Sequence, residues 1–172
     1  MIRHMLFDFD GTIVDSLDLA LRILNEMAEK HHYQKVTMEH MRQLKSMPIT
    51  ERFKKIGFPV YKMPAMAIEC AALYKRALPT LKPVPGIRDL IHSLKDQGIR
   101  LSILSSNSVD NISEFFRANE LELFDHISSA NNLFGKEKSI EKFTKQFQIH
   151  KEDLIYVGDE LRDIEACKLA GI

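Results

Sequence analysis

The sequence has few cysteines, no tryptophan and no excess of either charge. Cys70 and Cys167 lie far apart without Cys-x-x-Cys spacing, so buried, reduced thiols fit the sequence better than a disulfide scaffold. The 24 Lys and Arg residues balance 24 Asp and Glu residues, so no overall field attracts nucleic acid or an anionic membrane. No apolar run approaches the ~20 residues that span a bilayer, and an apolar strand begins too near the N-terminus to leave room for a signal peptide. We therefore expect a cytoplasmic protein without membrane or nucleic-acid partners.

The chain contains segments of two different characters. Residues 3–7 are apolar and predict a short β-strand, and from there to about residue 80 the apolar spacing is helical. From residue 81 onward, strands and helices alternate, which is typical of a parallel sheet covered on both faces. The expected strands are 100–104, 125–130 and 154–157, and the expected helices are 87–97, 109–118, 139–148 and 161–170. We predict an α/β core formed by 1–15 and 81–172, with an all-helical insertion at 16–80.

The most informative residues directly follow the first strand. Asp8 and Asp10 occupy alternate positions, and Gly11 and Thr12 come next. Because successive strand side chains point to opposite faces, we expect both aspartates on one side, at the carboxyl end of the strand. Open parallel sheets bind their ligands at that end. Two carboxylates there could share a hard cation, or one could attack a phosphorus atom while the other moves a proton. Two solvated carboxylates are the alternative.

A second polar group follows the strand at 100–104. Ser105, Ser106 and Asn107 lie where this strand turns into a helix, so they offer O–H and N–H donors to an anion. The N-terminus of the following helix adds its dipole. The alternative is that Ser106, Asn107 or Ser108 only caps that helix.

Lysines precede the helix expected at 139–148. Lys136, next to Gly135, could neutralise an aspartate and a phosphate oxygen together, because its ammonium group is a compact point charge. Lys138 is the alternative for this role. Both lysines could also be ordinary solvated residues.

The strand at 154–157 ends in Gly158 and Asp159, and Asp163 follows four residues later. Gly158 permits a tight turn, and Asp163 lies one helical turn beyond Asp159, so both carboxylates can point at one cation. Mg²⁺ prefers such oxygen ligands drawn from separate segments. Helix capping by Asp159, with Asp163 on the surface, is the alternative.

In this order, the four groups resemble the signatures of the haloacid dehalogenase-like (HAD) hydrolases. Those signatures are Asp-x-Asp-Gly-Thr, a hydrophobic strand ending in serine or threonine, a lysine just before a helix, and Gly-Asp with a second aspartate four residues on. The resemblance covers essentially all of 1–172, and residues 10–16 are most similar to the phosphoglycolate phosphatase and β-phosphoglucomutase branch. It implies a Rossmann-like parallel sheet core with an all-helical cap inserted after the first strand. It also implies a further strand beyond Ile172, so we expect 154–157 at the edge of the sheet.

The resemblance implies a Mg²⁺-dependent phosphatase that acts on a small phosphorylated metabolite. Asp8 would be the nucleophile that forms an aspartyl-phosphate, and Asp10 would be the general acid and base. Ser105 and Lys136 would stabilise charge on the phosphoryl group, and the cap would close over the site. The implied metal ligands are Asp8, Asp10 through its backbone carbonyl, Asp159 and Asp163. The implied phosphate-binding residues are Asp8, Gly11, Thr12, Ser105, Ser106, Asn107 and Lys136.

Two other functions stay open. A phosphosugar mutase would use the same machinery and needs cap groups for a second phosphate, which the loop 45–48 or the basic residues of 52–55 could supply. A non-enzymatic receiver domain, phosphorylated on an aspartate by a partner, is the alternative from a different class. Receivers lack a helical insertion after the first strand, which argues against that alternative.

Overall fold

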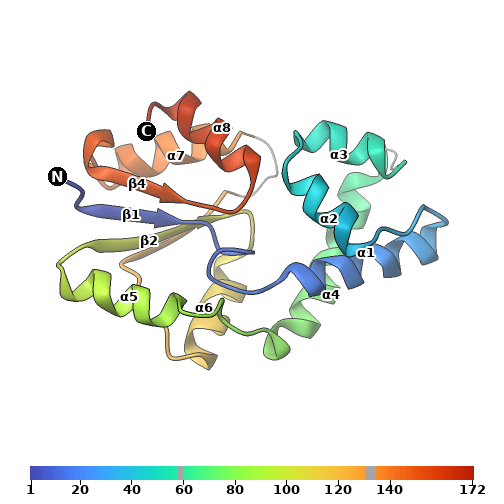
Figure 1. The fold of residues 1–172 in the computed structure, drawn as a ribbon, viewed down its shortest axis with the longest axis horizontal. Coiled ribbons are helices and arrows are strands. Elements are labelled where there is room, and N and C mark those ends of the chain that lie inside the picture. Colours follow the sequence, from blue (N-terminus) through green and yellow to red (C-terminus); the bar gives the residue numbers. More distant parts are fainter. Residues whose placement is uncertain (58–59, 131–134) are drawn as a thin grey trace. The chain divides into compact units, whose positions relative to one another are not determined.

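The computed structural model describes residues 1–57, 60–130 and 135–172 (Figure 1). The chain divides into two units by internal contacts. Unit 1 comprises Met1–Asp15, Lys82–Asp159 and Asp163–Ile172, and unit 2 comprises Ser16–Leu81 with Glu160–Arg162. Within these described ranges, no helix is both long and apolar enough to cross a membrane.

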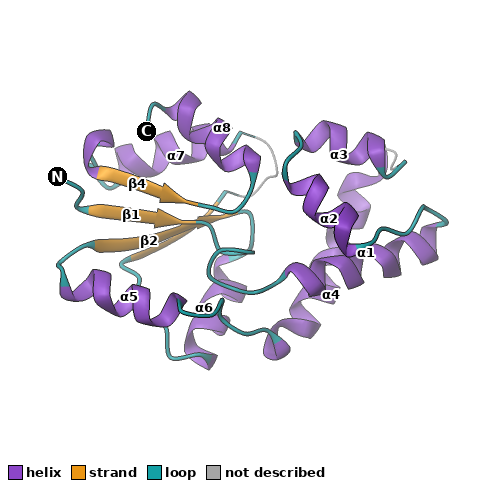
Figure 2. Cartoon of the chain, viewed as in Figure 1, coloured by secondary structure: helices purple, strands orange, loops and turns teal. Residues whose placement is uncertain are grey.

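Parallel strands form the sheet of unit 1, which is Rossmann-like (Figure 2). The described strands are β1 (His4–Phe7), β2 (Arg100–Ser105), β3 (His126–Ser129) and β4 (Leu154–Val157), in the spatial order β3-β2-β1-β4. Phe7 at the end of β1 pairs with Ile103 of β2 and with Val157 of β4. The carboxyl ends of three neighbouring strands therefore meet at one end of the sheet, and the polar sequence groups directly follow these ends.

Helices cover both faces of this sheet, as predicted (Figure 1). They are α5 (Ile87–Asp96) and α6 (Val109–Ala118) on one face, and α7 (Lys136–Gln146) and α8 (Leu161–Ala170) on the other. Leu6 of β1 belongs to a buried cluster with Phe143 of α7 and Ala166 of α8. Phe9 faces α6, where its ring lies edge-on to Phe115 at 5.3 Å. Burying a large apolar side chain such as Leu6 or Phe9 contributes about 1.5–3 kcal/mol to stability. Contacts on both faces of the sheet therefore hold β1 and the residues that follow it in place.

Helix α7 begins three residues earlier than the sequence predicts and ends two residues earlier. Gly135 has a positive φ of 76° and is the N-cap residue, and its carbonyl accepts hydrogen bonds from the amides of Lys138 and Ser139. The helix ends because Gln148 also adopts a positive φ, of 53°. Lys136 is consequently the first residue of α7 rather than a residue that precedes the helix.

Strand β4 lies at an edge of the sheet, as predicted, since among the described strands it pairs with β1 alone. Ile155 on this strand and Ile164 and Leu169 on α8 are exposed. Leu90 on α5 and Val109 on α6 are exposed as well, so exposed apolar side chains of unit 1 are not confined to this edge.

Unit 2 is helical throughout its described part. Its helices are α1 (Leu17–His31), α2 (Met38–Lys45), α3 (Ile49–Lys55) and α4 (Met63–Ala77), with short 3₁₀ turns at Val60–Lys62 and Leu78–Thr80. Thr37 starts α2 by accepting a hydrogen bond from the amide of His40, as an N-cap residue does. Val36, Met41 and Leu44 form a buried hydrophobic cluster in this unit.

Candidate active site

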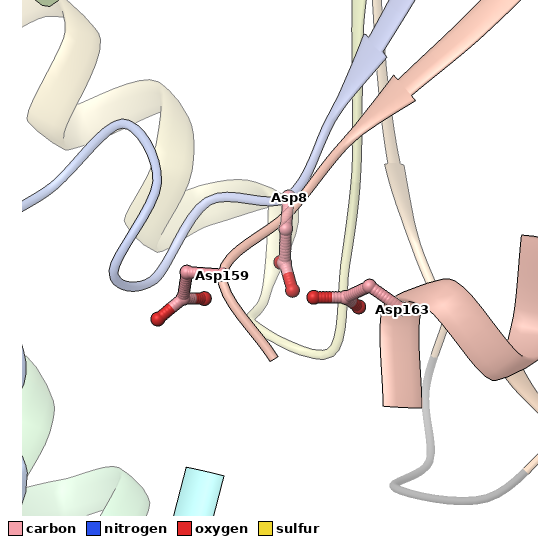
Figure 3. Close-up of side chains that lie close together, drawn as sticks. All are labelled: Asp8, Asp159 and Asp163. Carbon is pink, nitrogen blue, oxygen red and sulfur yellow. The ribbon is translucent and has the colours of Figure 1, made fainter. Parts of the chain in front are cut away.

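Three carboxylates from separate segments of unit 1 meet beyond the carboxyl ends of β1 and β4 (Figure 3). Asp8 follows β1, Asp159 follows β4, and Asp163 lies in the first turn of α8. One oxygen of each lies within 4.8 Å of one oxygen of the other two. Asp8 is 2% exposed and Asp163 is 3% exposed. Because buried ionised carboxylates are costly without compensating charge, this cluster requires cations.

Lys136 supplies one of those cations. Its Nζ donates to Oδ2 of Asp8 at 2.7 Å and also to Oδ1 of Asp163. The ammonium group lies 4.9 Å from the centre of the Tyr156 ring, which adds a cation–π contact. Lys136 is buried, whereas Lys138 is exposed, so of the two candidate lysines the structure brings Lys136 to the aspartates.

Two glycines make room for the carboxylates. Gly11 has a φ of 75°, and a Cβ atom added there would overlap the carboxylate of Asp159. A Cβ atom added at Gly158 would overlap Asp163. Larger residues at these positions would push the aspartates away from Asp8, which explains why glycine stands at both.

The orientation of Asp8 is fixed at both of its carboxylate oxygens. Its Oδ1 accepts a hydrogen bond of 2.6 Å from the backbone N–H of Phe9, and its Oδ2 accepts from Lys136. The backbone N–H of Asp8 donates to the Val157 carbonyl at 2.8 Å, which ties the residue to the end of β4. A side chain held in this way needs little reorganisation before it reacts.

Asp10 lies in a different environment from Asp8. β1 ends at Phe7, so the alternation of strand side chains does not extend to Asp10. The chain instead turns back, with the N–H of Gly11 donating to the Val14 carbonyl at 2.9 Å. Oδ2 of Asp10 accepts a hydrogen bond of 2.9 Å from Nδ2 of Asn107. The Asp10 carboxylate is therefore not a member of the three-aspartate cluster, although its backbone carbonyl stays a predicted ligand.

The polar residues at the end of β2 and just after it have different environments. Ser105 is 1% exposed, and its Oγ accepts a hydrogen bond of 3.3 Å from the N–H of Asn107. Ser106 is exposed. Ser108 is the N-cap of α6, with its Oγ accepting from the N–H of Asn111 at 3.2 Å. Capping therefore occupies Ser108, while the Asn107 side chain contacts Asp10.

Asn111 is a site residue that the sequence motifs did not predict. It is 9% exposed, and its Nδ2 donates to Oδ1 of Asn107 at 2.9 Å. The available signal was its position in the first turn of α6, four residues after Asn107, which lies just before that helix. Thr12 adds a polar atom, since its Oγ1 is buried with no hydrogen-bond partner among the described residues.

The chain matches the sequence profile of the haloacid dehalogenase-like hydrolases over residues 5–172. It belongs to this family. It is 29% identical to the phosphoglycolate phosphatase of Synechococcus elongatus over 172 residues, which cover 99% of this chain and 81% of that protein. It is also 24% identical to the pyrophosphatase PpaX of Halalkalibacterium halodurans, with coverage of 99% and 81%.

Solved structures of HAD proteins share the fold of this hydrolase. CbbY from Rhodobacter sphaeroides in complex with phosphate superposes with a TM-score of 0.77 at 23% identity, covering 100% of this chain and 84% of CbbY. A haloacid dehalogenase-like hydrolase of Streptococcus pneumoniae gives a TM-score of 0.82 at 21% identity, with coverage of 99% and 82%. The predicted fold class, a Rossmann-like core with a helical cap segment, is confirmed.

Proposed function

We propose that this HAD hydrolase is a Mg²⁺-dependent phosphatase that cleaves a small phosphomonoester through an aspartyl-phosphate on Asp8. The observation that carries the proposal is the buried Asp8 carboxylate, held at Oδ1 by the Phe9 amide and at Oδ2 by Lys136, beside Asp159 and Asp163. The names of the two curated relatives, a phosphoglycolate phosphatase and a pyrophosphatase, support a small phosphorylated substrate.

The reaction would proceed in two displacements at phosphorus. An oxygen of Asp8 attacks phosphorus, the bond from phosphorus to the ester oxygen breaks, and Asp10 donates its proton to the departing alcohol. Asp10, now a carboxylate, accepts a proton from a water molecule that attacks the aspartyl-phosphate. Inorganic phosphate leaves and Asp8 is regenerated. The hydrogen bond from Asn107 keeps Asp10 in place for both proton transfers.

The charges at the site fit a divalent cation. Asp8, Asp159 and Asp163 carry three negative charges when ionised, and Lys136 returns one positive charge, which leaves two negative charges. All three residues offer carboxylate oxygens, the donors that Mg²⁺ prefers. These aspartates and the Asp10 carbonyl would hold the ion. Bound there, Mg²⁺ would offset the negative charge of the phosphoryl oxygens.

Lys136 and Ser105 would act on the phosphoryl group itself. The ammonium group of Lys136 lies against Asp8, so it would neutralise the oxygens that approach this nucleophile. Ser105 lies at the carboxyl end of β2 and would donate its O–H to one of them. Electrostatic positioning of this kind is the main requirement of phosphoryl transfer.

A metabolite panel tests the proposal. The purified chain is assayed for release of inorganic phosphate from p-nitrophenyl phosphate and from a set of phosphorylated metabolites, first with Mg²⁺ and then with EDTA. We expect hydrolysis with Mg²⁺ and its loss with EDTA. Asp8→Asn should be inactive, and Asp89→Asn in the first turn of α5 is the matched control that should retain activity. Hydrolysis that survives EDTA or Asp8→Asn would contradict the proposal.

A further inference from the structure

We infer that Asn111 is a positioning residue for the proton-transfer step, because it sets the direction of the Asn107 amide that holds Asp10. The inference rests on the proposed function, in which Asp10 protonates the leaving group. Neither Asn111 nor the contact that it makes is required to bind phosphate or metal in that scheme.

The three side chains form a continuous chain of hydrogen bonds within unit 1. Nδ2 of Asn107 donates to Oδ2 of Asp10 at 2.9 Å. Oδ1 of Asn107 accepts from Nδ2 of Asn111 at 2.9 Å and from the backbone N–H of Ser108, also at 2.9 Å. The Asn107 amide therefore lies between Asp10 on one side and two donors at the start of α6 on the other.

The direction of this amide decides whether Asp10 is held or repelled. The NH₂ end of an amide only donates, and the oxygen end only accepts. Asn111 and Ser108 both present N–H groups, so they keep the oxygen of Asn107 on their side. With the amide reversed, this oxygen would repel Asp10 when Asp10 is ionised. When Asp10 is protonated, the same oxygen would accept its proton and draw that proton away from the leaving group.

The burial of Asn111 supports a role for its side chain beyond helix formation. Its neighbours on the buried face of α6 are apolar, namely Ile112, Phe115 and Phe116. A buried amide costs free energy unless it is hydrogen-bonded, so an apolar residue would suit this position better for packing alone. The start of α6 does not need the amide either, because the Ser108 hydroxyl already caps the backbone N–H of Asn111.

The expected signature is a change in leaving-group dependence. An alkyl phosphate releases a strongly basic alkoxide unless a general acid protonates it, whereas p-nitrophenolate leaves with little help. A variant that misplaces Asp10 should therefore slow the first displacement more for alkyl esters than for aryl esters. The ratio kcat/KM reports this step even when the second displacement limits kcat.

The test uses the full chain with Mg²⁺ and two variants, Asn111→Asp and Asn111→Leu. Asn111→Asp keeps the shape but replaces the donor with an acceptor, and Asn111→Leu suits the apolar surroundings, so at least one variant should fold. The substrates are p-nitrophenyl phosphate and the alkyl phosphomonoester that the wild type hydrolyses fastest. We expect kcat/KM to fall at least about 10-fold for the alkyl ester, up to the 10²–10⁴-fold of a lost general acid, and at most about 3-fold for the aryl ester.

Ser108→Ala is the matched control. It removes the N-cap of α6 but keeps the backbone N–H that Asn107 contacts, so it should lower thermal stability and leave the ratio of the two kcat/KM values unchanged. Equal losses on both esters in the Asn111 variants, or the same change of ratio in Ser108→Ala, would overturn the inference and leave the phosphatase proposal intact. A wild-type chain that hydrolyses neither ester would instead overturn the proposed function.

Discussion

Replacing Lys136 with methionine should strongly destabilise the metal-free protein. Lys136 is 8% exposed and donates to both Asp8 and Asp163, which are themselves buried. Methionine has a similar length and fills the same space, so the substitution removes the charge and little packing. The two carboxylates would then lie side by side in a poorly solvated site without their shared cation.

The size of the effect follows from this geometry. Removing one partner from a buried ion pair costs about 3–5 kcal/mol, because the remaining charge is neither solvated nor paired. Lys136 serves two buried carboxylates, so we expect a loss in this range. Lys138→Met is the matched control, since Lys138 is exposed on the same helix, and it should change stability by no more than about 0.5 kcal/mol.

The assay is urea unfolding followed by circular dichroism, with EDTA and then with saturating Mg²⁺. With EDTA, the free energy of unfolding of Lys136→Met should fall by about 3–5 kcal/mol below the wild type. Mg²⁺ should stabilise this variant, because a ligand at 100 times its Kd adds about 2.7 kcal/mol to the folded state. A loss below about 1 kcal/mol with EDTA, or an equal loss in Lys138→Met, would show that Lys136 does not offset the charge of the two buried carboxylates.

Three other predictions test separate parts of the account. Asp8→Asn should abolish hydrolysis without unfolding the protein, and Asp10→Asn should lower kcat by about 10²–10⁴-fold, measured by phosphate release. Beryllofluoride with Mg²⁺ should raise the melting temperature by mimicking the phosphoryl group on Asp8, and Asp159→Ala should erase that increase. Burial, assisted by the nearby charge of Arg100, lowers the pKa of His4 from 6.5 to about 4. The unfolded chain binds this proton more readily than the folded protein, so the free energy of unfolding should fall as the pH drops from 6.5 towards 4, by about 3 kcal/mol at most. Urea unfolding of His4→Leu should lack this part of the pH dependence.

The strand and helix order could be predicted because the hydrophobic periodicity of each segment agrees with its position in the fold. The start of α7 could not, since Gly135 adopts a left-handed conformation that extends the helix to Lys136. The alternation of strand side chains also could not predict the environment of Asp10. That environment depends on β1 ending at Phe7 and on the turn that follows.

The composition of the site was partly predictable for similar reasons. Asp8, Asp159 and Asp163 follow strands or begin a helix, so topology alone brings them to one end of the sheet. The neighbouring Gly135 favoured Lys136 over Lys138 in the sequence, but the helix geometry is needed to show that the first is buried and the second exposed. Asn111 was missed because it lies on a helix face whose other residues are apolar core residues.

Covalent catalysis by Asp8 is tested most directly by detecting a phosphoryl group on this residue. The Asp10→Asn variant is mixed with p-nitrophenyl phosphate and Mg²⁺ and quenched in acid. It should accumulate the aspartyl-phosphate on Asp8, because p-nitrophenolate leaves with little acid catalysis, whereas the hydrolysis of the aspartyl-phosphate lacks the Asp10 base. Mass spectrometry of the digested protein should find the phosphoryl mass on the peptide that contains Asp8. If this variant or the wild type hydrolysed the substrate in a single turnover and no phosphorylated Asp8 were found at any quench time, an aspartyl-phosphate on Asp8 would be contradicted.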